Sequence, residues 1–317
     1  MPTLATYRHT VSPLLGIYES GTADSSGNST SLLVCSTSLL ASGTSAKSTV
    51  LSSSTYKGKW MYLPSGATAD KSRLIDTYTP STGGFKPDNN WSAAPTSLAF
   101  EILSPFSGTE LNELINLALK KLFVTVDFTF VGAGTSIFRN SLATAASWLT
   151  DPSWIYQVGS LVTATADLTT MDPYRNYRTG RADIDTDGST VYLRGPTFAT
   201  TETAYVKAIK PAYDHCAAAA TPTVFTQAGL SADADVAKPH ELWVAYQTML
   251  EAADRLDHLL SIGQADQKMA ANRQLIASRL SRMSRGKFIP PERTFTSPAH
   301  MGPTSIDTWS RASVSSW

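Results

Sequence analysis

Charge is scarce in this sequence. Asp, Glu, Lys and Arg make up 16% of the 317 residues, and 26 acidic and 26 basic side chains cancel to a formal net charge of zero. Nucleic-acid and anionic-membrane binding usually rely on long-range attraction by an excess of positive charge. The composition therefore disfavours a dedicated DNA-binding protein.

Cysteines and long apolar runs are also few. The two cysteines, Cys35 and Cys216, lie far apart and belong to no CxxC or metal-ligand spacing, so no disulfide framework is expected. No window approaches the roughly 18 apolar residues that a membrane span requires. The N-terminus, MPTLATYRHT, also lacks the basic region and apolar core of a signal peptide. We therefore expect no membrane partner.

Small hydroxylated side chains are abundant where charge is missing. The stretch from Glu19 to Thr37 reads ESGTADSSGNSTSLLVCST, and the only charged residues between Glu19 and Lys57 are Asp24 and Lys47. Hydroxyl-rich, β-branched sequence with interspersed glycines is typical of short strands and tight turns. This part of the chain is predicted to present a polar, nearly uncharged β surface.

The sequence predicts an α+β fold that begins with a β-rich module over residues 1–106. KGKWMYLPSG alternates so that Trp60 and Tyr62 share one strand face, KSRLIDTYTPSTGG ends in a glycine turn, and SLAFEIL supplies another strand. A small barrel or sandwich is the natural interpretation, and we expect a barrel-like region.

Residues 107–213 are predicted to form a helix followed by a second β region. Ser107 and Glu110 have capping-box spacing, and the helix that follows has one apolar face: Leu111, Leu114, Ile115, Ala118 and Leu122. FVTVDFTFV alternates as a half-buried strand, and further strands are expected at SWIYQVG, STVYLRG and TAYVKAIK.

Residues 214–238 are Ala/Thr-rich and are interpreted as a connection, whereas residues 239–287 predict a helical hairpin. The first helix has a seam with steps of four and three: Leu242, Tyr246, Met249, Ala253, Leu256 and Leu260. Gly263 can end that helix, and the second helix has its own apolar side: Met269, Ile276, Leu280 and Met283. Residues 288–317 contain four prolines and no sustained period, and they predict an extended C-terminal arm with aromatic anchors. This arm either becomes ordered on a neighbouring subunit or packs on its own subunit.

Acidic and basic residues are distributed unevenly between the two helices of the predicted hairpin. Its first helix is mainly acidic and its second region mainly basic: Glu241, Glu251, Asp254 and Asp257 against Arg255, then Lys268, Arg273, Arg279, Arg282, Arg285 and Lys287 against Asp266. The two helices either complement each other and keep solvated outer faces, or the basic side meets an acidic neighbour or a nucleic-acid backbone.

Motifs that suggest chemistry have simpler explanations. In RADIDTDGST, Asp183, Asp185 and Asp187 reproduce the opening of a calcium loop, but Arg194 occupies the position of the closing carboxylate. Asp187-Gly188 is better interpreted as a hairpin turn. GAGTS, residues 132–136, lacks the ending of a phosphate loop.

The histidines give no clear site either. Adjacent residues such as His215 and Cys216 do not generally face each other as a nucleophile and its base, and the dispersed histidines, including His240 and His258, form no HExxH set. The seven tryptophans are interpreted mostly as buried anchors. We assign no catalytic, cofactor-binding or metal-binding residue and expect no enzyme.

Several segments resemble a module in structural proteins of tailed bacteriophages. The similarity is carried by GTADSSGNSTSLLV, by KGKWMYLPSGATADKSRLIDTYTPSTGG, by SLAFEIL with the helix ELNELINLALKKL, and by the later YVKAIKPAY, the helical hairpin and RGKFIPPERTF. The resemblance covers most of the chain, and its motifs are structural.

The resemblance implies a virion protein of the neck, the head-to-tail adaptor or connector. Such a protein would form a ring of copies, contact the portal protein and tail or other neck proteins, and leave a channel through which genomic DNA passes. Subunits in a ring cover one another, which suits a nearly uncharged surface. Two alternatives stay open: a tail or baseplate component, and a carbohydrate-binding module for host attachment.

Overall fold

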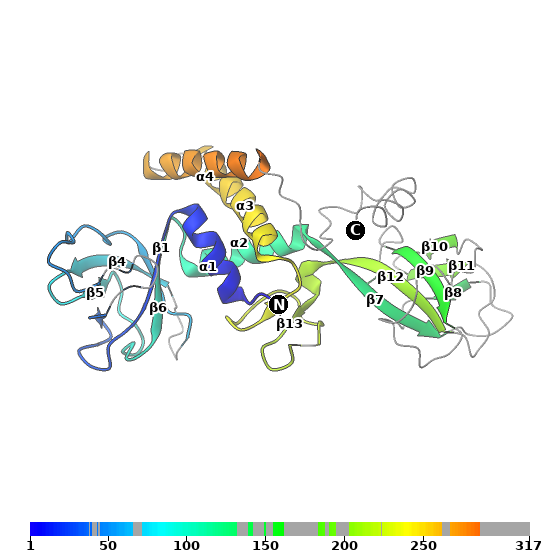
Figure 1. The fold of residues 1–317 in the computed structure, drawn as a ribbon, viewed down its shortest axis with the longest axis horizontal. Coiled ribbons are helices and arrows are strands. Elements are labelled where there is room, and N and C mark those ends of the chain that lie inside the picture. The colour runs from blue at the N-terminus through cyan, green and yellow to red at the C-terminus, as the bar shows by residue number, and fades with distance from the viewer. Residues whose placement is uncertain are drawn as a thin grey trace. The chain divides into compact units, whose positions relative to one another are not determined.

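The computed structural model describes most of the chain as two compact units (Figure 1). The described residues are 1–37, 39, 43, 45–65, 72–131, 139–141, 149, 155–161, 183–187, 190–194, 203–222, 224–261 and 267–285. Unit 1 combines Met1–Lys120 with Cys216–Pro291, and the described part of unit 2 falls within Lys121–His215. The α+β class is confirmed, with helices and antiparallel sheets in one chain.

Unit 1 contains a six-stranded antiparallel sheet in the order β1-β6-β3-β4-β5-β2. Its strands are β1 (Ile17–Thr22), β2 (Leu33–Val34), β3 (Trp60–Tyr62), β4 (Ser72–Thr79), β5 (Gly84–Pro87) and β6 (Ala99–Ser104). The strands expected in KGKWMYLPSG, KSRLIDTYT and SLAFEIL are therefore confirmed as β3, β4 and β6.

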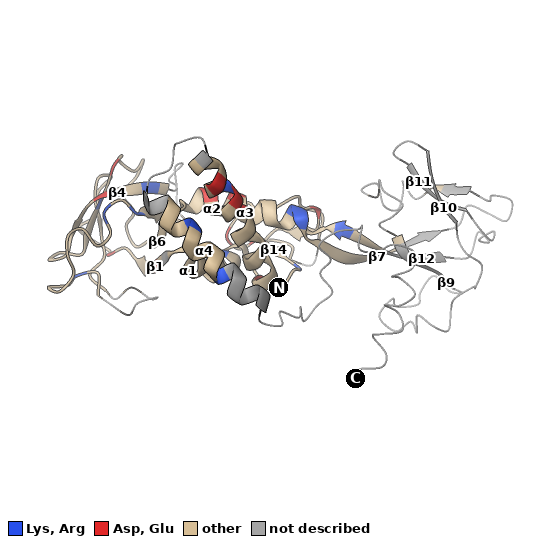
Figure 2. Ribbon diagram, turned by 90° about the horizontal axis from the view of Figure 1, so that it is seen from above, with Lys and Arg blue, Asp and Glu red and all other residues tan. Residues whose placement is uncertain are grey.

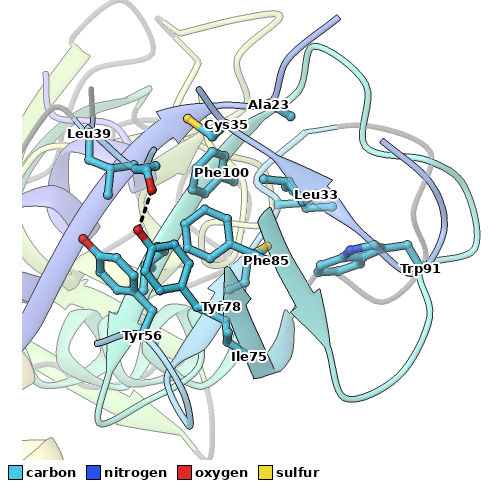
Figure 3. Close-up of a cluster of buried hydrophobic side chains, with 14 residues drawn as sticks. Ala23, Leu33, Cys35, Leu39, Tyr56, Ile75, Tyr78, Phe85, Trp91 and Phe100 are labelled. Atoms are coloured by element: carbon cyan, nitrogen blue, oxygen red, sulfur yellow. Dashed lines mark hydrogen bonds between the residues drawn. The ribbon is translucent and has the colours of Figure 1, made fainter. Parts of the chain in front are cut away.

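An aromatic core lies against one face of this sheet (Figure 3). The rings of Tyr78 and Phe85 stack with centroids 5.0 Å apart, and Tyr56 meets Tyr78 edge to face at 4.9 Å. The Tyr78 hydroxyl donates to the carbonyl oxygen of Ala46, the bond dashed in Figure 3. Burial of the ring surface with its polar group satisfied stabilises these short strands.

The barrel-like module is not closed by strand pairing. The two edge strands approach at one end, where the Asp24 amide, just after β1, donates to the Val34 carbonyl oxygen of β2 at 2.8 Å. The Asp24 carboxylate also accepts from the Ser36 amide at 3.0 Å. One aspartate thus joins the edges where the ladder has ended.

Helix α1 (Leu4–Leu15) corrects the assignment of residues 1–106 to β structure. The Thr3 hydroxyl accepts from the Thr6 amide at 3.1 Å as the N-cap. The buried face includes Leu4, Tyr7, Val11 and Leu15, at helical spacing. Because Thr, His and Pro have modest or poor helix propensity, the segment did not stand out in the sequence.

Helix α2 (Gly108–Lys121) begins at the predicted capping box. The Glu110 amide donates to the Ser107 hydroxyl at 3.2 Å, and the Ser107 amide donates to the Glu110 carboxylate at 3.0 Å. The predicted apolar face is buried: Leu111, Leu114, Ile115, Ala118 and Leu122.

Residues 214–238 carry more structure than the predicted connection. They follow the short helix η2 (Ala212–Asp214) and form the small pair β13 (Cys216–Ala217) and β14 (Val236–Ala237). The Leu4 amide donates to the Asp235 carbonyl oxygen at 3.0 Å. This segment therefore holds the N-terminal helix.

The predicted helical hairpin is present as α3 (Glu241–Ser261) and α4 (Gln267–Arg285). Figure 1 shows α3 beside α1 and α4 across them. The seam prediction is wrong at Leu242, which is 40% exposed, whereas Met249, Ala253 and Leu256 are buried as expected. The buried stripe also includes Val244, Ala245, Thr248 and Ala252, so it is broader than a two-position seam. Gly263 and the arm 288–317 lie outside the described residues.

Unit 2 contains two three-stranded antiparallel sheets, β7-β12-β9 and β10-β11-β8. The strands are β7 (Phe123–Val131), β8 (Arg139–Ser141), β9 (Ile155–Leu161), β10 (Asp183–Asp187), β11 (Thr190–Arg194) and β12 (Thr203–Pro211). β7 and β12 pair without interruption from Phe123 opposite Pro211 to Val131 opposite Thr203. The strands predicted in this region are confirmed.

The glycine at the β4–β5 turn gives a direct test of this fold. Gly83 has φ +68°, and a Cβ there would lie 2.1 Å from the Cys35 carbonyl oxygen. Gly58 has φ +74° with no atom within 4 Å of such a Cβ. Gly58→Ala should lower the free energy of unfolding by about 1 kcal/mol, from the left-handed backbone alone. Gly83→Ala should cost about 2 kcal/mol more, because a backbone atom must move. Urea unfolding of both variants measures this, and equal losses would show that the turn is not packed against Cys35.

Candidate functional site

The residues that suggested chemistry do not converge on a site. Asp183 pairs with Arg194 and Asp187 with Thr190 in the β10–β11 hairpin, which confirms the hairpin interpretation. Its connecting residues 188–189, like 132–136, lie outside the described part of the chain. Across the described residues, no group of three or more His, Cys, Asp or Glu is placed to hold a metal ion.

The cysteines and histidines considered in the sequence lie in the following surroundings. Cys35 and Cys216 are buried free thiols, and Cys35 belongs to the aromatic core. His215 is buried beside Cys216 at the end of η2. The His240 ring nitrogen Nδ1 accepts from the Leu242 amide at 3.3 Å, at the start of α3.

The most concentrated polar arrangement in the described structure is centred on Arg8, a residue that the sequence analysis did not single out. Its side chain is 0% exposed. Nε and Nη2 donate to the two carboxylate oxygens of Glu101 at 2.7 and 2.8 Å. Nη1 and Nη2 donate to the two carboxylate oxygens of Asp233 at 2.9 and 2.7 Å. Nη1 also donates to the Asn112 side-chain oxygen at 3.1 Å. All five N–H groups of the guanidinium thus have acceptors.

Tyr62 completes this cluster. The Arg8 guanidinium carbon lies 4.7 Å from the centroid of the Tyr62 ring, a cation–π arrangement. The Asn112 side-chain nitrogen donates to the Tyr62 hydroxyl at 3.2 Å. A Cβ on Gly108 would lie 2.2 Å from this ring, so glycine at the first turn of α2 lets the ring approach. We call Arg8, Glu101, Asp233, Asn112 and Tyr62 the Arg8 cluster.

The Arg8 cluster joins segments that are far apart in the sequence. Arg8 comes from α1, Glu101 from β6, Asn112 from α2, Tyr62 from β3, and Asp233 from the segment before β14. β6 makes this possible because both of its faces are buried. Phe100 and Ile102 enter the aromatic core, and Glu101 on the opposite face meets Arg8.

Pairing of Arg8 with the carboxylates of Glu101 and Asp233 determines the direction of the pKa shifts in the cluster. Burial tends to lower the pKa of Arg8, but the hydrogen bonds and charges of Glu101 and Asp233 outweigh burial and raise that pKa above its usual value. Burial tends to raise the pKa of Glu101, but Arg8 and His9 outweigh it and hold that pKa below its usual value. Both groups are therefore charged over the physiological range.

His9 gives the cluster its solvent-exposed edge. Its side chain is 49% exposed, and Nε2 lies 3.1 Å from a Glu101 carboxylate oxygen. Its ring centroid is 5.4 Å from that of Tyr18 on β1. Since both Glu101 oxygens already accept from Arg8, Glu101 is held in place and is poorly suited to proton transfer.

Asp235 organises the segment that carries Asp233. This aspartate is buried, and one of its oxygens accepts from the amides of Ser231 and Ala232 at 2.9 and 2.8 Å and from the Gln227 side chain at 2.8 Å. Its other oxygen accepts from the Ala219 amide at 3.2 Å. Burial tends to raise the pKa of Asp235, but these hydrogen bonds outweigh it and lower the pKa to about 2.

Some charged residues of the hairpin bind partners inside unit 1. Figure 2 shows acidic residues on α3 and basic residues on α4. Arg273 of α4 donates to both carboxylate oxygens of Asp257 on α3, each at 2.7 Å. Arg279 donates to the carbonyl oxygens of Pro13 and Leu14 at the end of α1. For Arg273, the interpretation that the two hairpin helices complement each other is confirmed, whereas Arg279 binds the end of α1 instead.

Among the described tryptophans, Trp91 fits the prediction of a buried anchoring side chain. Trp91 is 2% exposed in the aromatic core, and Trp60 and Trp243 are half-buried. The Arg73 guanidinium carbon lies 5.5 Å from the centroid of the Trp91 ring. Trp148, Trp154, Trp309 and Trp317 lie outside the described residues.

Comparisons with protein-family models, with curated proteins and with solved structures find no match. None of the described helices combines the length and apolar character that a bilayer crossing needs.

Removal of Arg8 should be strongly destabilising. Arg8→Met leaves Glu101 buried without its cation, and we expect a loss of about 3–5 kcal/mol in the free energy of unfolding. The matched control Arg273→Met removes an exposed ion pair and should cost about 0.2–1 kcal/mol. Denaturant unfolding measures both. The triple variant Arg8→Met, Glu101→Leu, Asp233→Leu should recover part of the loss, since no buried charge stays unpaired. Similar small losses for both single variants would contradict the central role of Arg8.

The depressed pKa of Asp235 predicts how the free energy of unfolding depends on pH in the acid range. Because its pKa is depressed to about 2 in the folded chain, its contribution is complete above the unfolded value near 4 and is lost as the pH falls towards 2. The difference in unfolding free energy between wild type and Asp235→Asn should therefore be on the order of 2 kcal/mol at pH 6 and shrink between pH 4 and pH 2. Asp254→Asn, on the exposed side of α3, is the control. A difference that does not change with pH would refute this assignment.

Proposed function

We propose that this chain is a non-enzymatic structural subunit of a tailed-bacteriophage particle, located in the neck, where copies of it form a ring between portal and tail around a DNA channel. The resemblance of its segments to neck proteins motivates the proposal. Its partners would be copies of itself, the portal protein, and tail or other neck proteins, with passing contact to genomic DNA.

The observation that carries this proposal is how the chain uses its buried polar groups. The Arg8 cluster directs its hydrogen bonds to several segments of unit 1, and the Asp235 carboxylate ties together residues 219–232 of the segment that supplies Asp233. Together they join α1, β3, β6, α2 and the segment 216–237. A subunit that transmits force in a particle needs such cross-connection, because each surface loop would otherwise move independently.

The segments that carry the resemblance lie largely within this connected unit. KGKWMYLPSG contains β3, SRLIDTYT is β4, SLAFEIL contains most of β6, and ELNELINLALKKL is most of α2. Tyr62, Glu101 and Asn112 of the Arg8 cluster bind β3, β6 and α2 together, and β4 pairs with β3 in the same sheet. This agreement supports the proposal that the similar sequence segments form one structural module.

A tail or baseplate position would use the same kind of subunit and stays an alternative. The carbohydrate-binding alternative receives less support, because Trp60, Trp91 and Trp243 are half-buried or buried and form no exposed aromatic platform among the described residues.

Localisation of the chain in the intact particle tests the proposal. We expect electron cryo-microscopy of the particle to place several copies of unit 1 around the axis between head and tail, since a chain without net charge has little long-range repulsion between copies. A ring found on tails that lack heads would favour the tail alternative. One asymmetric copy per particle, or absence from the particle, would refute the ring.

A further inference from the structure

We draw no further inference here: the strongest candidate, the surface patch where unit 1 exposes the apolar side chains of Met1, Val224 and Leu242 on segments that meet around residues 237–238, carries none because nothing among the described residues shows what covers it.

Discussion

The buried guanidinium of Arg8 imposes the constraint on which unit 1 depends. An arginine removed from water must present five N–H groups to acceptors, and its charge must be balanced nearby. Glu101, Asp233 and Asn112 meet that requirement, and they come from three different segments. The position of α1 against β6, and the path of the chain around residue 233, are fixed together because each supplies part of one hydrogen-bonded set. The backbone contacts between α1 and residues 233–237 follow from the same arrangement.

This constraint links the structure to the proposed role. A neck subunit must be rigid where it transmits load and adaptable where it meets its neighbours. The Arg8 cluster and the aromatic core supply rigid connection inside unit 1. The scarcity of charge fits the same division, because surfaces shared by copies in a ring avoid like-charge repulsion. The chain thus concentrates its paired buried charges where its own segments meet.

Local features were predictable from the sequence, and long-range ones were not. The capping box at Ser107, the alternating strand at Phe123 and the hairpin at Asp187 depend on residues close in sequence, and each is present. Arg8 and Glu101 are 93 residues apart, and Arg8 and Asp233 are 225 apart, so no spacing rule pairs them. A charge inside the apolar strand SLAFEIL was the available signal, since a buried carboxylate requires a partner. Leu242 was misassigned to the buried face because periodicity predicts which face of a helix is apolar. It does not predict how far along the helix the packed neighbouring elements extend.

Native-state hydrogen exchange tests most directly whether the Arg8 cluster couples these segments. If it does, the slowest amides of α1, β6 and residues 231–237 should exchange with one common free energy of opening in the wild-type chain, and they should all lose protection in Arg8→Met. If α1 amides instead exchange at a clearly lower free energy than those of β6, and the Arg8→Met change affects α1 alone, then α1 is a peripheral helix and the account of unit 1 as one connected body is wrong.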